Sequence, residues 1–139
     1  MKTKITVTGF EHEELVNILS TALYGTFWFG AGYDRSVYES LAEKNGDCFE
    51  DILADMLLAG HKITIRDYEA EGESYSDKCV GINEVDDSAE YEIGIEDFLK
   101  VASTEEGYKL VQEALSGDGD YYTADAFLQR VVFGEVIYS

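Results

Sequence analysis

Asp118, Asp120 and Asp125 have a spacing that could suit a metal site, because hard divalent cations bind clustered carboxylates. A calcium loop of the EF-hand type beginning at Asp118 needs a further ligand at its fifth position and a glycine at its sixth. Those positions hold Tyr122 and Thr123. A divalent-metal-dependent enzyme is therefore one alternative, but the two mismatches favour an acidic loop between helices, with no metal.

His12 and His61 are the only histidines, and neither has a second ligand at the spacing of a zinc site. We expect both to lie at the surface or at the edge of an element. Cys48 and Cys79 are expected to be free thiols in a reducing cytoplasm, with a single disulfide or redox pair as the alternative. Because no nucleophile motif accompanies these residues, the sequence predicts a protein without catalytic residues or a cofactor.

The segment 25–33 places three consecutive aromatic residues, Phe27, Trp28 and Phe29, among glycines at 25, 30 and 32. These glycines lack the lysine and serine or threonine of a P-loop. An exposed aromatic platform would stack a base, so a small-ligand or nucleotide-binding protein is an alternative function. An alternating strand would instead bury either Trp28 or its two neighbours, and this favours packing in the core.

The chain carries 29 acidic and 10 basic residues in 139, a formal net charge of −19. Without a basic patch it has no means of releasing counterions from a nucleic acid, so direct nucleic-acid binding is disfavoured. Attachment to anionic lipid is disfavoured for the same reason. No window approaches the roughly 18 apolar residues of a membrane span, and the amino-terminal residues lack the pattern of a signal peptide. We expect a cytoplasmic protein without a membrane partner.

The acidic residues are unevenly distributed. Residues 1–35 have a net charge of −1, whereas residues 61–100 have a net charge of −8. A solubilising surface explains such charge in many proteins, and a surface for a basic partner protein is the other interpretation. The residues predicted to form that surface are Asp67, Glu69, Glu71, Glu73, Asp77, Glu84, Asp86 and Asp87.

The periodicity of apolar residues predicts an α+β fold in a single domain, 1–139. Strands are expected at 3–8, within 26–33, at 61–68 and near 90–95. Helices are expected at 11–25, 47–60, 95–102 and 103–117, with a last helix from about Thr123. This gives a small antiparallel sheet of about three to four strands packed against about four helices.

Two details of this prediction concern local pairing. Capping boxes are expected where Asp47 precedes Glu50 and where Ser103 precedes Glu106. The strands at 61–68 and 90–95 are expected to pair across a mobile acidic connection, residues 69–89. Lys62 and Arg66 would then face two glutamates, Glu90 and Glu92.

Two segments carry a family resemblance: Gly25-x-x-Trp28, and residues 123–138 (TADAFLQRVVFGEVIY). With the order of elements between them, they resemble a group of small uncharacterised proteins of bacteriophages, prophages and conjugative elements. The resemblance covers most of the chain, with 34–46 and 69–89 as variable insertions. It implies a setting in a bacterial host cell. The leading hypothesis is therefore a non-enzymatic accessory protein that binds a basic host protein, as a nucleic-acid-mimicking inhibitor of a CRISPR or restriction system.

Overall fold

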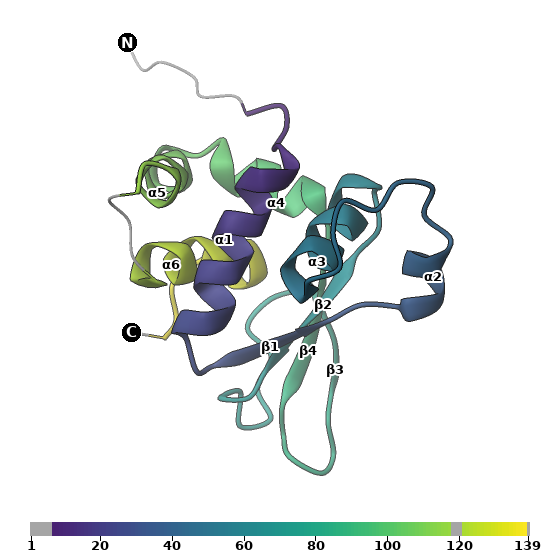
Figure 1. The fold of residues 1–139 in the computed structure, drawn as a ribbon. Coiled ribbons are helices and arrows are strands. Elements are labelled where there is room, and N and C mark those ends of the chain that lie inside the picture. Colours follow the sequence, from purple (N-terminus) through teal and green to yellow (C-terminus); the bar gives the residue numbers. More distant parts are fainter. Residues whose placement is uncertain (1–6, 118–120, 139) are drawn as a thin grey trace.

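The computed structural model describes residues 7–117 and 121–138 (Figure 1). Four strands in these residues form one antiparallel sheet in the order β1-β2-β4-β3. The strands are β1 (Phe29–Gly32), β2 (Ile63–Asp67), β3 (Cys79–Ile82) and β4 (Ala89–Ile93). The helices are α1 (His12–Gly25), α2 (Arg35–Glu39), α3 (Phe49–Leu58), α4 (Ile95–Ala102), α5 (Glu105–Leu115) and α6 (Tyr121–Phe133). The predicted α+β fold class is confirmed.

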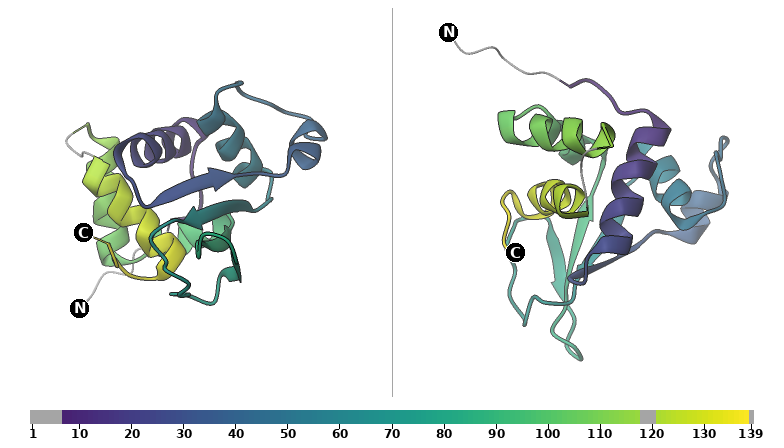
Figure 2. Two further views of the ribbon diagram at one scale, coloured as in Figure 1. Left: turned by 90° about the horizontal axis from the view of Figure 1, so that it is seen from below. Right: turned by 60° about the vertical axis from the view of Figure 1, so that its left-hand side comes forward.

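The core lies between the helices and one face of the sheet. Alternate residues of β2 and β4 are buried on that face, among them Ile65 and Tyr91. Helix α1 contacts β1, α3 contacts β2 and α6 contacts β4 (Figures 1 and 2). The helices contribute the apolar stripes that the sequence predicts, including Leu15, Ile18, Leu53, Leu57, Phe127, Leu128 and Val132. None of the helices in the described residues is both long and apolar enough to cross a membrane.

The other face of the sheet carries polar side chains. Arg66 lies opposite Glu90 in the register of β2 and β4, and the two side chains form the expected ion pair. The second expected pair is wrong, because Thr64 rather than Lys62 lies opposite Glu92. Lys62 precedes the first residue of β2 and so has no partner in this register.

Two predicted capping boxes differ from the structure. Thr104 rather than Ser103 caps α5, and its hydroxyl accepts a hydrogen bond from the backbone N–H of Gly107. Ser103 is instead the C-cap residue of α4, and its hydroxyl accepts from the N–H of Val7, 2.9 Å away. Helix α3 begins after Cys48, one residue later than expected, without a side-chain cap.

The predicted elements near the ends of the chain also need correction. Of the strand expected at 3–8, residues 3–6 lie outside the described residues, and residues 7 and 8 are not in a strand. Helix α6 begins at Tyr121, two residues before the expected cap at Thr123. Helix α2 lies in 34–46, a segment for which no element is predicted, and the side chain of Asp34 caps it.

The connection at 69–89 is attached to the body of the protein at several points. It contains β3, which pairs with β4 at the edge of the sheet. Ala70 is fully buried, the N–H of Tyr75 donates to the hydroxyl of Tyr91, and the hydroxyl of Ser76 donates to the carbonyl of Val132. Its mobility stays a prediction, and these contacts limit which parts of it can move.

Gly107 provides a test of how α4 and α5 pack. A Cβ at this position would lie 1.9 Å from the carbonyl oxygen of Val101. Although alanine favours helices over glycine, we expect Gly107→Ala to lower the free energy of unfolding by about 1–3 kcal/mol because of this overlap. Urea unfolding measures the change. Gly81→Ala is the control, since no atom lies within 4 Å of its added Cβ, and equal stability of both variants would contradict the packing described.

Candidate functional site

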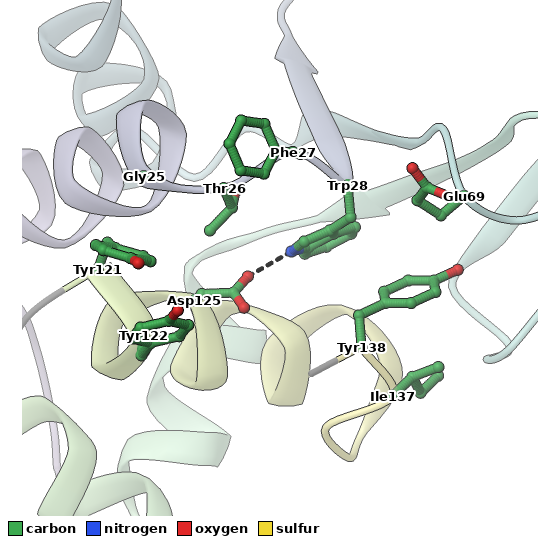
Figure 3. Close-up of a pocket in the computed structure, with 10 residues that line it drawn as sticks. All are labelled: Gly25, Thr26, Phe27, Trp28, Glu69, Tyr121, Tyr122, Asp125, Ile137 and Tyr138. Carbon is green, nitrogen blue, oxygen red and sulfur yellow. Dashed lines mark hydrogen bonds between the residues drawn. The ribbon is translucent and has the colours of Figure 1, made fainter.

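A cavity of about 570 Å³ opens where the end of α1, the start of α6 and the carboxyl-terminal segment meet (Figure 3). It contains the first half of the predicted aromatic and glycine segment. Its volume is within the range of about 300–1,000 Å³ that small-molecule sites occupy. The lining residues are Gly25, Thr26, Phe27, Trp28, Glu69, Tyr121, Tyr122, Asp125, Ile137 and Tyr138.

Asp125 anchors one wall of the cavity. One of its carboxylate oxygens accepts a hydrogen bond from the indole Nε1 of Trp28, and the other accepts from Nε2 of Gln129 at 2.9 Å. Figure 3 shows the Asp125 side chain directed from α6 toward the indole. Because two donors hold this carboxylate, its position and that of the Trp28 ring depend on each other.

Gln129 is fully buried and fixes the carboxyl-terminal segment as well. Its Oε1 accepts from the N–H groups of Ile137 and Tyr138, both at 2.8 Å, and its Nε2 also donates to the carbonyl of Tyr138. Buried backbone groups need such partners because leaving one unpaired costs about 1–3 kcal/mol. The side-chain amide of Gln129 thus takes the place of the hydrogen bonds that a helix or strand would give the backbone of the carboxyl-terminal segment.

Tyr138 closes the network at β2. Its hydroxyl donates to Asp67 at 2.7 Å, and the other oxygen of Asp67 accepts from the N–H of Glu69. Burial raises the pKa of Asp67, although these two hydrogen bonds oppose the shift. Burial, together with the carboxylate of Asp67, raises the pKa of Tyr138. Tyr138 therefore remains a neutral donor at any physiological pH.

The three consecutive aromatic residues have two different roles. Trp28 and Phe29 are both buried, and the Trp28 ring contacts Phe29, Phe133 and Tyr138. Phe27 is 94% exposed. The alternation expected of a strand fails because β1 begins only at Phe29, so that Trp28 enters the core from an extended segment. Phe29 does not line the cavity, whereas Phe27 and Trp28 do.

Gly25 brings α1 and α6 close together beside the cavity. A Cβ at this position would lie 2.1 Å from Cβ of Tyr121. The sequence predicts Gly25 as a helix stop, and α1 does end there, with Thr26 extended as its cap. The close approach to Tyr121 is a second requirement for glycine that the sequence does not reveal. Gly25 and Tyr121 both line the cavity, so this close approach forms part of its wall.

Most of the predicted acidic surface is exposed, with one correction. Asp67 is 0% exposed and faces the core, so it is not part of that surface. The exposed members are Glu69, Glu71, Glu73, Asp77, Glu84, Asp86 and Asp87. The N–H of Gly72 donates to the carbonyl of Asp87 at 2.8 Å, which brings residues 69–73 and 84–87 together. Two acidic runs that are separated in the sequence therefore meet beside the same end of the sheet.

The predicted metal ligands do not form a site within the described residues. Asp118 and Asp120 lie outside those residues. Asp125 is held by Trp28 and Gln129. Across residues 7–117 and 121–138, no group of three or more histidine, cysteine or acidic side chains is placed to hold a metal ion.

His12 is the first residue of α1, at the edge of an element as expected, and its side chain is 23% exposed. Its Nε2 is buried, 3.2 Å from a carboxylate oxygen of Asp55 but without hydrogen-bond geometry. Asp55 is itself buried and accepts from Asn45 and from the hydroxyl of Tyr38. The cluster joins α1 to α3. His61, at the start of the strand predicted at 61–68, is exposed as expected.

Both cysteines are free thiols, as predicted. Glu50, together with burial and further acidic neighbours, raises the pKa of the Cys48 thiol. The thiol form is favoured over the nucleophilic thiolate, so this environment does not activate Cys48.

No protein-family model, curated protein or solved structure matches this chain. The geometry and charge of the molecule therefore carry the functional argument.

Gln129→Ala tests the anchoring network. We expect it to lower the free energy of unfolding by about 2–4 kcal/mol, because several partly buried backbone groups and one carboxylate oxygen of Asp125 lose a hydrogen-bond partner. Denaturant unfolding followed by the fluorescence of Trp28, the only tryptophan, measures the effect. Gln112→Ala, at an exposed position of α5, is the control. A loss no greater than that of the control would contradict the anchoring role.

Asp67→Asn tests the buried carboxyl. Folding raises the pKa of Asp67, so ionisation of this side chain opposes folding. The protein therefore loses stability as the pH rises from the unfolded pKa of about 3.9 through the folded pKa, and it does not regain that stability at higher pH. The amide can still accept from Glu69 and donate to Tyr138. We expect the stability of the variant relative to the parent protein to be more favourable at pH 7 than at pH 4.

Urea unfolding of both proteins at the two pH values measures this difference. Asp77→Asn, which removes an exposed carboxylate, controls for the change in net charge. An Asp67→Asn effect that is the same at pH 4 and pH 7 would show that burial does not penalise the charge.

Proposed function

We propose that this protein is a non-enzymatic binding protein that captures a basic protein through exposed carboxylates beside the end of the sheet. We call this surface the acidic tip and define it as Glu69, Glu71, Glu73, Glu84, Asp86 and Asp87. The observation that carries the proposal is the hydrogen bond between Gly72 and Asp87, which joins the two acidic runs into one surface. Figure 1 shows the β3–β4 hairpin, which holds one of these runs, extending away from α4 and α5.

The backbone of the acidic tip supports a role beyond solubility. Glu71 and Asp87 have φ angles of 51° and 60°, in the left-handed region that non-glycine residues seldom occupy. Placing carboxylates near one another also costs free energy through repulsion. A solubilising surface gains nothing from concentrating charge in this way. A surface that attracts a cationic partner does, because the local potential steers and orients the encounter.

The resemblance to proteins of mobile elements supplies the proposed setting. Such an element benefits from blocking host enzymes that act on nucleic acids. A compact protein with clustered carboxylates would occupy a basic channel that otherwise holds phosphates. In this proposal the partner is a host protein of a CRISPR or restriction system, and the acidic tip mimics the nucleic acid that the partner normally binds.

The cavity favours this class of function over nucleotide binding. Its charged lining residues, Glu69 and Asp125, are both acidic. Phosphate groups would be repelled there, so the chemistry of the site does not support the nucleotide alternative. With Asp125 held by two hydrogen bonds, the described residues give no support to the metal-dependent enzyme either.

Neutralising the acidic tip tests the proposal. The probe is a fluorescently labelled nona-arginine peptide, and anisotropy measures its affinity. The triple variant Glu71→Gln, Glu73→Gln and Asp87→Asn removes three charges. If each contributes about 0.5 kcal/mol, the dissociation constant rises about tenfold and the salt dependence of binding falls.

The matched control removes three exposed carboxylates elsewhere, by Glu43→Gln, Glu105→Gln and Glu135→Gln. Both triple variants change the net charge equally, so the control should weaken binding about twofold or less. Equal weakening by the two triples would mean that diffuse charge attracts the peptide, and the proposal of a localised surface would then be abandoned.

A further inference from the structure

The cavity beside Trp28 combines aromatic walls with carboxylates. Phe27, Tyr121 and Tyr122 supply exposed ring surface from the end of α1 and the start of α6. In Figure 3 the two tyrosines lie on one side of Asp125, and Trp28 and Tyr138 lie on the other. Among the residues that the structure describes, the lining includes no lysine, arginine or histidine. The electrostatic character of the cavity is therefore negative from both its carboxylates and the faces of its rings.

From this geometry we infer that the cavity binds an organic cation of the guanidinium or alkylammonium class. Ring faces attract such cations, and a carboxylate pairs with their N–H groups. A metal ion would need several oxygen ligands in a compact cluster, and a phosphate would meet two carboxylates. A cation that carries its charge on a flat or apolar group fits both features of this cavity.

Phe27 is the residue that the fold itself does not explain. Its ring is 94% exposed. The backbone around it is nevertheless fixed, because the hydroxyl of Thr26 donates to the carbonyl of Ala22 and the carbonyl of Trp28 accepts from the N–H of Tyr68. An immobilised backbone that presents an exposed phenyl ring at the mouth of a cavity is suited to cover a bound cation.

Glu69 and Asp125 take different parts in this site. Asp125 is fixed by Trp28 and Gln129, and each of its oxygens retains a further lone pair for a ligand. Glu69 is exposed at the rim, and its backbone is fixed by the bond from its N–H to Asp67. Asp125 thus provides a rigid charge inside the cavity, and Glu69 provides an adaptable one at its entrance.

Glu69 also belongs to the acidic tip, so the cation has two possible sources. It is either a free small molecule or an arginine or lysine side chain of a bound protein. The second source rests on the proposed function, whereas the first does not. The chemistry of recognition is the same in both, and the experiment has one arm for each.

Titration followed by Trp28 fluorescence tests the inference, because Trp28 is the only tryptophan and lines the cavity. The first arm uses methylguanidinium and tetramethylammonium at constant ionic strength. The second uses a short peptide with one arginine and capped ends. We expect saturable binding in at least one arm, with a dissociation constant of about 1–10 mM for the free cations, since such small ligands make few contacts.

Two variants localise the binding. Phe27→Ala and Glu69→Gln should each weaken it about three- to fivefold, as loss of one exposed cation–π contact or one exposed charge pair implies. Tyr24→Ala and Glu43→Gln are the matched controls, since Tyr24 is 76% exposed, Glu43 is exposed and outside the acidic tip, and neither residue lines the cavity. They should change the affinity less than about twofold.

The outcomes separate this inference from the proposed function. Tighter binding of the peptide identifies a side chain as the source, and tighter binding of the free cations identifies a small molecule. No saturable response in either arm, equal effects of the site and control variants, or adenosine monophosphate binding more tightly than the cations would each overturn the inference. If the proposed role of the acidic tip is wrong, the two triple variants will weaken nona-arginine binding equally. The response of Trp28 to free cations will then be unchanged.

Discussion

The buried amide of Gln129 makes four hydrogen bonds that position the rest of the candidate site. Through Asp125 it determines where the Trp28 indole lies, and through the backbone of Tyr138 it holds the carboxyl-terminal segment against the sheet. Tyr138 in turn reaches Asp67 at the end of β2. One polar group thus positions side chains from α6, from β2 and from the segment before β1. Leaving a buried donor or acceptor of this network unpaired would cost free energy, so its members hold one another in place.

The end of β2 links the cavity to the acidic tip. Asp67 is buried and contacts Tyr138, whereas Glu69, two residues later, lies at the rim of the cavity and begins the acidic run. The hydrogen bond between Gly72 and Asp87 then brings the second run alongside the first. The carboxylates of the two acidic runs therefore lie together, near the aromatic cavity beside Trp28. Carboxylates beside aromatic rings are the arrangement expected for recognising cationic groups.

Local sequence patterns predicted the fold class and the buried helical faces. The buried side of a helix shows as apolar residues at helical spacing, such as Phe127, Leu128 and Val132. The contacts that make the site were not predictable in this way. The burial of Asp67 depends on Tyr138, 71 positions away, and the geometry of Gly25 depends on Tyr121. Trp28 and Phe29 are buried together because the strand begins later than its aromatic pattern indicates. Each of these depends on tertiary packing that no local window contains.

Localised recognition of cationic groups can be measured by mapping the amide and indole chemical shifts during titration with an arginine-containing peptide. We expect the largest changes on residues 69–73 and 83–88 and on the single indole N–H of Trp28, which donates to Asp125 at the cavity. Changes spread in proportion to charge over all acidic surfaces, with the indole signal unmoved, would contradict it.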